Sequence, residues 1–414
     1  MGGVMDTRIY NLKNISVIKS GKRLPAGHVF AKGKTNHAYV RARDIRNGTI
    51  SSDNLVYISD FTYDKIKRYI IEKGDVAITI VANIGDVGYC EDNCHGANLT
   101  ENAVRLTNID KKIVDAKYLA LLLGQPSMKN YMESLAAGAA QAKLGIYKIE
   151  NIQVSIPERT YQHRIVNIIS SYDNLIDINT KRIKLLEETA RELYKEWFVR
   201  MRFPGHEQAK FVKGIPEGWA LKELKELVST QYGLTTTAHS EKESNDVYYL
   251  RITDIVDNYI DWSHVPYCTA DDDIITKYKL FPGDLLVART GATVGYATQI
   301  QKIPFDAVFA SYLIRLKAKN KLHISYIGMS VVSDTFRDYI QSIATGAAQP
   351  MANPHLMTSF KLFLPCDSLL EKFNEKIDLI NDEILTLQLQ NQNLIATRDR
   401  LLPRLLSGEL KVKA

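Results

Sequence analysis

The chain has 414 residues, 45% of them hydrophobic and 24% charged, which is the composition of a globular protein with about two to three domains. Its four cysteines exclude a disulfide framework, no apolar run reaches the about 18 residues of a membrane-spanning helix, and the start lacks a signal-peptide core, so a cytoplasmic protein is expected. The net charge of +6 permits a nucleic-acid partner. It is modest for a chain that would bind DNA alone, so we expect another subunit to share in the DNA binding.

Residues 1–157 are predicted to form a mixed module of short strands and a few helices. Apolar runs of strand length, such as residues 75–81, alternate with glycines, which is typical of short strands joined by turns. The length agrees with an ordinary domain of about 150 residues. Pro157 marks the end of this module.

Residues 158–202 are predicted to form one long helix with a coiled-coil seam. Apolar residues recur at alternating steps of four and three, and Asn179 is the polar exception. Pro204 and Gly205 end the helix and begin a linker that runs to Trp219. The seam positions are Ile165, Ile169, Tyr172, Ile176, Asn179, Ile183, Leu186, Ala190, Leu193 and Trp197.

Residues 203–365, a linker and a second module, repeat much of the first module. In the best segment the offset is constant, because 346−138, 349−141 and 365−157 all equal 208, and both copies contain the sequence Gly-Ala-Ala-Gln. Two similar modules in tandem usually meet a partner that also repeats, and a DNA duplex is the commonest. The further matches are residues 39–45 with 249–255, Gly21 with Gly233, Gly74 and Asp75 with Gly283 and Asp284, and residues 87–89 with 294–296, the last with two residues fewer before them.

Residues 366–414 are predicted to form a second long helix in the same heptad frame. Because Asn391 and Arg398 interrupt its seam, its C-terminal half is expected to pair more loosely. We expect the two long helices to pack on each other, with Asn179 and Asn391 fixing the register; two helices that each cover their own module are the alternative. The seam positions are Phe373, Ile377, Ile380, Ile384, Leu387, Asn391, Leu394, Arg398, Leu401 and Leu405.

The motifs of catalysis are missing from the sequence. There is no GxxxxGK[ST] phosphate loop, and residues 291–295 have the wrong spacing for a GxGxxG cofactor loop. Residues 353–356 resemble an amino-methylation loop only superficially. Cys90, Cys94 and His95 lack a second pair of zinc ligands, which favours a loop with incidental cysteines. We predict a protein that is not an enzyme and that itself binds no metal or cofactor.

Polar and basic residues on glycine-rich loops are the candidates for DNA contact, since Arg and Lys suit guanine, Gln suits adenine, and other cations suit phosphates. A solvated surface position is an equal alternative for each. Only Arg251 has a recognisable partner in the first copy, Arg41; Gln141 and Gln349 also recur, which favours a structural role, because residues that read different half-sites should differ. The candidates are Lys22, Arg23, Lys34, Arg41, Arg43, Gln141, Lys143, Arg251, Arg289, Thr290 and Gln349.

Residues 186–206 resemble the central conserved region of the specificity subunits of type I restriction-modification systems, and residues 400–408 resemble their distal conserved region. The Gly-Asp strands and the two Gly-Ala-Ala-Gln loops are similar to the target recognition domains of that family. The resemblance covers essentially the whole chain. It implies an α+β fold in which two pseudo-symmetric mixed α/β recognition domains are joined by two helices that form an antiparallel coiled coil.

The resemblance also implies a function. Each recognition domain would read one half of a bipartite site in double-stranded DNA, and the helices would set the spacing and dock two methylation subunits. Those partners would bring S-adenosylmethionine, and motor-nuclease subunits recruited through them would bring ATP and Mg²⁺; no membrane is implied. A non-catalytic scaffold whose two modules hold protein partners is the alternative, and an autonomous methyltransferase or nuclease ranks last.

Overall fold

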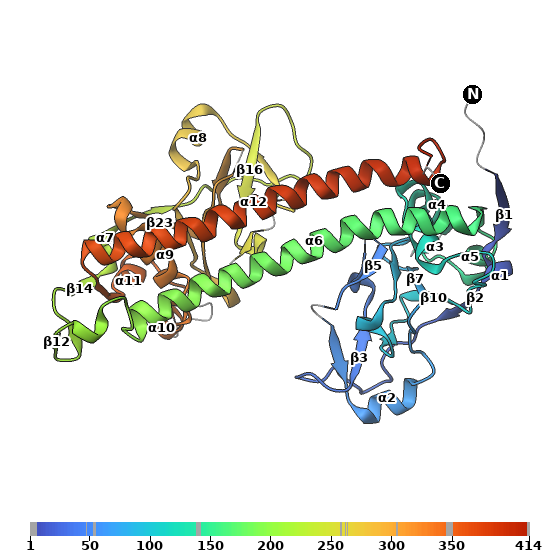
Figure 1. Cartoon of the computed structure of the whole chain (residues 1–414), viewed down its shortest axis with the longest axis horizontal. Coiled ribbons are helices and arrows are strands. Elements are labelled where there is room, and N and C mark those ends of the chain that lie inside the picture. Colours follow the sequence, from blue (N-terminus) through green and yellow to red (C-terminus); the bar gives the residue numbers. More distant parts are fainter. Residues whose placement is uncertain are drawn as a thin grey trace. The chain divides into compact units, whose positions relative to one another are not determined.

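A computed structural model describes residues 6–46, 48–52, 55–137, 142–256, 259–260, 262, 264–303, 305–344 and 351–411 (Figure 1). The chain divides into two units. The first unit comprises residues 1–178 and 391–414, and the second comprises residues 179–390. This division differs from the four consecutive segments expected from the sequence, because each unit combines one module with the nearer part of both long helices.

The first unit is built on a six-stranded sheet. Its order is β2 (Val17–Ser20), β10 (Ala103–Thr107), β7 (Val76–Thr79), β8 (Val87–Tyr89), β5 (Gly48–Ile50) and β4 (Ile45–Arg46). A second sheet has the order β6 (Val56–Ile58), β3 (His37–Val40) and β9 (Asn98–Leu99). All four residues of β7 are buried, as expected for a central strand whose sequence reads as an apolar run.

The two ends of the first module are held together by strands. Strand β1 (Thr7–Asn11) pairs antiparallel with β11 (Gln153–Pro157), directly before the long helix. Helix α3 (Ala116–Leu123) begins where the side chain of Asp115 accepts hydrogen bonds from the free backbone N–H groups of Lys117 and Tyr118. The short helices are α1 (Leu12–Ile15), α2 (Asp60–Ile66), α3 (Ala116–Leu123), α4 (Pro126–Ala136) and α5 (Ile146–Glu150).

The second unit repeats this plan. Its main sheet has the order β15 (Val228–Tyr232), β23 (Leu313–Ala318), β20 (Leu285–Ala288) and β21 (Ala297–Gln299), and a second sheet has the order β19 (Tyr267–Thr269), β16 (Asp246–Leu250) and β22 (Ala307–Phe309). Strand β14 (Ala220–Glu223) pairs with β24 (Lys361–Leu364), as β1 pairs with β11. Two hairpins pair β12 (Phe211–Val212) with β13 (Ile215–Pro216) and β17 (Ile255–Val256) with β18 (Tyr259–Ile260). The short helices are α7 (Leu224–Leu227), α8 (Asp272–Tyr278), α9 (Ile324–Val331), α10 (Asp334–Ala344) and α11 (Pro354–Thr358).

One of the sequence matches between the modules is wrong by three residues. Val87 is the first residue of β8, and the corresponding first residue of β21 is Ala297, not Val294. The true counterpart of Gly295 is Gly85, since both lie at positive φ and both donate to the carbonyl that ends the preceding strand run. The sequence match was misplaced because residues 294–296 resemble residues 87–89, although the glycines that form the same turn are Gly85 and Gly295.

The recurring Gly-Asp motif holds a buried ion pair in each unit. Asp75 Oδ2 lies 3.1 Å from Arg105 Nη1, and Asp284 Oδ2 lies 3.2 Å from Arg315 Nη1. Each carboxylate also accepts a backbone N–H from the turn before its strand. Burial raises the pKa of Asp284. In both units the ion pair links one central strand of the main sheet, β10 or β23, to the turn that precedes the neighbouring strand, β7 or β20.

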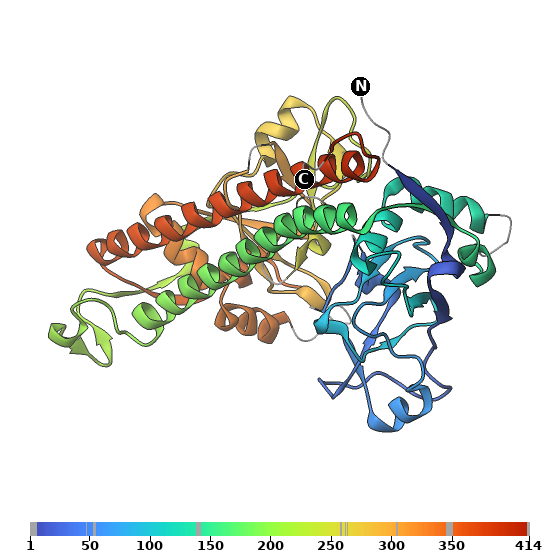
Figure 2. The same ribbon diagram turned by 45° about the vertical axis from the view of Figure 1, so that its right-hand side comes forward.

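The long helices α6 (Arg159–Tyr194) and α12 (Asp367–Leu406) pair antiparallel within each unit. In the first unit Ile165 and Ile169 share a buried cluster with Leu405 and Leu406, and Figures 1 and 2 show these turns side by side. In the second unit the rings of Trp197 and Phe373 lie 5.8 Å apart. The predicted antiparallel pairing of the two long helices is therefore confirmed.

None of the described helices has the length and apolar character needed to cross a membrane.

The polar seam residues of α12 find hydrogen-bond acceptors on α6. Arg398 donates to Asp173 Oδ1 at 2.8 Å, and Asn391 donates to the carbonyl of Ile176 at 3.4 Å. Beyond them, Leu405 and Leu406 are buried in the first unit. The facing helix thus supplies an acceptor for each polar side chain. Ile384 and Leu387 are buried, whereas Leu394 and Leu401 are only half-buried, and looser pairing of the C-terminal half stays a prediction.

Candidate nucleic-acid interface

Three backbone segments meet at one corner of the first unit, which we call the first corner. It comprises residues 20–23 at the end of β2, Ile80 and Val81 after β7, and residues 143–146. Leu144 N–H donates to the carbonyl of Ile80 at 3.0 Å, and Val81 forms a β-bridge with Lys143. These contacts hold side chains from distant parts of the sequence around one hollow.

The second unit has the same arrangement, which we call the second corner. It comprises residues 232–234, Arg289 and Thr290, and Met351 and Ala352. Ala352 N–H donates to the carbonyl of Arg289 at 2.9 Å, and Thr290 forms a β-bridge with Met351. Arg289 is thus the counterpart of Ile80, and Met351 is the counterpart of Lys143.

A glycine permits the close approach of backbones at both corners. A Cβ on Gly21 would lie 2.0 Å from the carbonyl oxygen of Thr100, and one on Gly233 would lie 2.2 Å from that of Ala310. Both distances are far inside van der Waals contact, so neither position can hold a side chain without moving the backbone. The recurrence of this glycine, noted from the sequence, follows from this packing.

The first corner encloses a hollow of about 590 Å³ with an apolar floor and a cationic rim. Ile80, Leu144 and Ile146 contribute the apolar lining. The rim carries the predicted candidates Lys22, Arg23 and Lys143, all exposed. Lys22 Nζ lies 5.8 Å from the centre of the Tyr69 ring, and Arg23 Nε lies 3.7 Å from Glu101 Oε1. Sequence reasoning missed Tyr69 because nothing in its local pattern points to this hollow.

The second corner is aromatic where the first is cationic. The Arg289 guanidinium lies 5.0 Å from the centre of the Tyr232 ring. Tyr232, Tyr312 and Met351 are exposed at 46%, 58% and 52%. Sequence reasoning selected Arg289 and Thr290 but missed these three neighbours, which become visible only once the two corners are superimposed segment by segment.

Two further candidates have a structural function in the described residues. Arg41 donates to both oxygens of Asp44 at 3.0 and 2.9 Å, and Arg251 does the same to Asp254 at 3.1 and 2.8 Å. The hydrogen bond to Asp254 is the main cause that raises the pKa of Arg251. Each pair closes the short 3₁₀ helix after β3 or β16, which explains why this arginine recurs between the copies.

The structure says less about the four remaining candidates for DNA contact. Lys34 is exposed on a loop of the first unit, and Arg43 is exposed on the short 3₁₀ helix Ala42–Asp44. Gln141 and Gln349 lie outside the described residues, and the described chain resumes shortly after them at Ala142 and Met351. Both corners therefore directly follow the recurring Gly-Ala-Ala-Gln segment in the sequence.

The superficial methylation motif is a helix start. Asn353 Oδ1 accepts the N–H of Leu356 at 2.9 Å, and Pro354 is the first residue of α11. This is an N-cap, and its counterpart Gly145 stands at the start of α5. The position needs no catalytic explanation.

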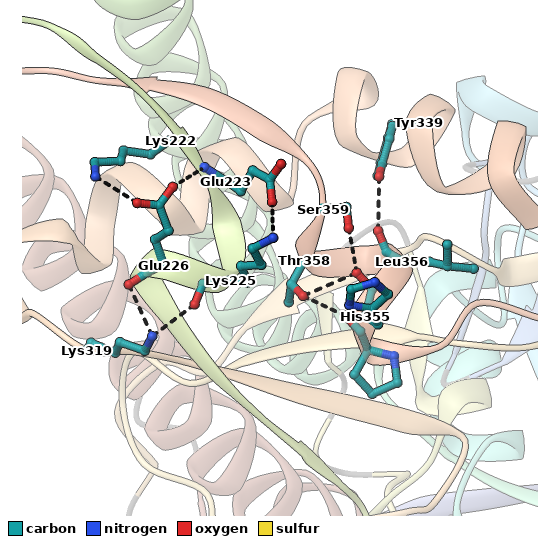
Figure 3. A network of polar contacts seen from close by, with 11 residues as sticks. Lys222, Glu223, Lys225, Glu226, Lys319, Tyr339, His355, Leu356, Thr358 and Ser359 are labelled. Carbon is teal, nitrogen blue, oxygen red and sulfur yellow. Dashed lines mark hydrogen bonds and ion pairs between the residues drawn. The ribbon is translucent and has the colours of Figure 1, made fainter.

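Two networks of polar contacts hold the segments that lead into and out of the second corner (Figure 3). Before β15, Lys222 Nζ of β14 contacts Glu226 Oε2 of α7 at 2.7 Å, and Lys319 Nζ caps α7 by donating to the carbonyl of Lys225 at 2.9 Å. On α11, the Tyr339 hydroxyl donates to the carbonyl of Leu356 at 3.0 Å. The backbone on both sides of the corner is therefore fixed.

The cysteines of the first unit are buried together. The Cys90 and Cys94 sulfurs lie 2.9 Å apart, and their hydrogen bond lowers the pKa of Cys94 and raises that of Cys90. His95 Nδ1 instead accepts the backbone N–H of Lys73. Among the residues that the structure describes, no group of three metal-binding side chains occurs.

Comparison with known proteins agrees with this architecture. The family model described as the type I restriction modification DNA specificity domain matches residues 6–188. The type I restriction enzyme MjaIX specificity subunit of Methanocaldococcus jannaschii is 23% identical over 358 residues, which cover 83% of this chain and 79% of that protein. The putative MjaX specificity subunit of the same organism is 23% identical over 429 residues, which cover 99% of this chain and 94% of that protein.

A solved structure supports the fold over the full length. The crystal structure of a type I restriction-modification system S subunit from M. genitalium matches with a TM-score of 0.54 and 14% identity, covering 100% of this chain and 98% of the other. The resemblance to specificity subunits that was read from the sequence is confirmed by the family model and the two relatives, whereas this structural match supports the fold alone. Residues 6–188 match the type I restriction modification DNA specificity domain, and nearly the whole chain is similar to specificity subunits of type I restriction enzymes.

Proposed function

We propose that each unit of this chain reads one half of a bipartite DNA sequence through its corner. The observation that carries the proposal is the pair of corners, which share their backbone contacts and differ in their side chains. Base sequence is read by side chains, whereas the framework only positions them. Two readers of different half-sites are therefore expected to keep the framework and to exchange residues such as Ile80 and Arg289.

The long helices are proposed to set the separation of the half-sites and to dock two methylation subunits. Large apolar residues are exposed on the outside of the helical pair, on α6 at Leu175, Ile178 and Leu185 and on α12 at Leu379 and Leu389. At about 100° per residue, the three on α6 fall within roughly 80° of the helix circumference. A grouped apolar face of this kind marks a protein interface.

The partners are proposed to carry the chemistry of the complex. Methylation subunits would bind S-adenosylmethionine, and motor-nuclease subunits bound through them would use ATP and Mg²⁺. Two methylation subunits are proposed because the resemblance to specificity subunits implies two. The remaining alternative is a scaffold that binds only proteins. It would not explain why the side chains of the two corners differ.

Methylome sequencing tests the half-site proposal. The full chain is expressed with its methylation subunit in a host that lacks other DNA methylation. The modified motif should have two specified parts separated by a fixed number of unspecified base pairs. A continuous motif, or an assembled complex that modifies no defined motif, would favour the scaffold.

The docking proposal is tested on the exposed face of α6. Replacing Leu175, Ile178 and Leu185 by Gln should weaken binding of the methylation subunit at least tenfold, because burial of each apolar side chain is worth about 1.5–3 kcal/mol. Lys184→Gln, at an exposed position of the same helix away from that face, is the matched control. Equal binding of both proteins in calorimetry would show that the subunit docks elsewhere.

A further inference from the structure

Arg289 is the one candidate whose guanidinium is half-buried and lacks a carboxylate partner in the described part of the second unit. Its Nε is buried and has no hydrogen-bond partner, and its Nη2 reaches only the sulfur of Met351, at 3.8 Å. The sulfur of methionine is a weak acceptor. Most of the donor capacity of this side chain is therefore unused within the described chain.

The other half-buried or buried arginines of the same main sheet and its flank are satisfied. Arg315 donates to Asp284 and to the carbonyl of Lys279, and Arg251 holds both oxygens of Asp254. Keeping a guanidinium partly buried without acceptors costs free energy. An acceptor from outside the chain would remove that cost.

The guanidinium has a neighbour on two sides. Tyr232 lies against one side of it at 5.0 Å, and the Met351 sulfur lies beside its Nη2. Tyr232 itself directly precedes Gly233, whose close approach to Ala310 fixes the strand end. An arginine that packs beside an aromatic ring is less mobile than a free surface cation, and its planar fork of donors suits a planar pair of acceptors.

The surroundings favour a base edge over the DNA backbone as the acceptor. Phosphate is normally met by several mobile cations, such as the three at the rim of the first corner. At the second corner the equivalent positions hold Leu234, Thr235 and Met351, and the exposed neighbours are Tyr232 and Tyr312. A single oriented arginine among aromatic and apolar side chains matches the O6 and N7 acceptors of guanine.

We propose that Arg289 is a specificity-determining residue that reads a guanine in the half-site of the second unit, with Tyr232 as its positioning residue. The inference rests on the proposed function and deepens it. At the first corner the counterpart is the apolar Ile80, which donates no hydrogen bond. The two half-sites therefore differ at the base pair that these equivalent positions face.

The test compares Arg289→Met and Arg289→Lys in the assembled complex with the methylation subunit. Methylation rates are measured on duplexes in which each position of both half-sites is varied in turn. Arg289→Met should lower the preference for guanine at one position of the second half-site by about tenfold or more, leaving the first half-site unchanged. Arg289→Lys keeps the charge without the two-donor fork, so it should lose most of that preference and serves if Arg289→Met fails to fold. Lys376→Met, on an exposed turn of α12, is the control for the loss of one positive charge.

Two results would overturn the inference. In the first, Arg289→Met lowers the methylation rate equally on all duplexes, and the salt dependence of DNA binding falls by about the amount expected for one phosphate contact. Arg289 would then contact the DNA backbone and not a base. Unaltered discrimination in both variants would remove it from the interface. If the unsubstituted complex reads a bipartite motif, either result refutes only the role of Arg289; if it does not, the proposed function fails with it.

Discussion

Asp75 with Arg105 and Asp284 with Arg315 are the clearest case of a residue pair kept in both units. All four side chains are at most 9% exposed, and each aspartate lies in the turn that begins a central strand. The Gly-Asp motif was visible in the sequence. The arginines were not, because they come from the neighbouring strands β10 and β23, and strand pairing leaves no local mark.

Breaking this pair should be far more costly than breaking an exposed one. Asp75→Asn leaves Arg105 buried without a counter-charge, and the free energy of unfolding should fall by about 3–5 kcal/mol. Asp92→Asn, which removes an exposed pair with Lys73, should change it by less than about 1 kcal/mol. Urea unfolding measures both. Equal effects would mean that the buried pair contributes no more than a surface pair.

Gly21 offers a second test at the residue scale. Gly21→Ala places a Cβ 2.0 Å from the carbonyl oxygen of Thr100, so strand β2 must shift, at a cost of about 1–3 kcal/mol or more. Gly33→Ala meets nothing within 4 Å and is the matched control. Thermal unfolding of the two variants should therefore differ by several degrees. A Gly21→Ala protein as stable as the control would contradict the close backbone contact.

At the scale of elements, the two long helices were the most predictable part of the chain. Their heptads repeat over many turns, and the end predicted before Pro204 lies close to the end of α6 and the π-helical turn over Lys195–Val199 that follows it. The short strands were predicted only where they form buried apolar runs, as in β7 and β20. The corners were missed as a site, because each is assembled from three segments separated by about 60 residues and, apart from Gly21 and Gly233, the backbone contacts that join them carry no residue preference.

Paired insertions test whether the helices set the distance between half-sites. One heptad is added after Leu186 on α6 and one after Ile380 on α12, which keeps both seams in phase. Seven residues lengthen a helix by about 10 Å, or about three base pairs of DNA, so the unspecified spacer should grow by about that number. Two-residue insertions at the same places rotate the seams and should impair folding instead. A heptad variant that modifies the original motif with its original spacer would show that the helices are not the ruler.

At the scale of the whole molecule, both ends of the chain contribute to the first unit. The hydroxyl of Tyr161, near the start of α6, donates to the carbonyls of Leu405 and Leu410 at 3.2 and 3.0 Å. The sequence predicted two repeated modules and two helices, and the family resemblance predicted their antiparallel pairing. The division of both helices between the units could not be predicted, because heptads show which residues pack together but not which module each turn packs against.

The central claim is that each unit reads its own half-site, and exchanging one module tests it most directly. Residues 220–364 run from the first residue of β14 to the last residue of β24, so the exchanged segment begins and ends at one strand pair and leaves α6 and α12 intact. They are replaced by the same region of a related specificity subunit that modifies a different motif, and the methylome of the assembled complex is sequenced. One half of the bipartite motif should change to that of the donor, with the other half and the spacer unchanged. A change in both halves, or in neither, would contradict the account.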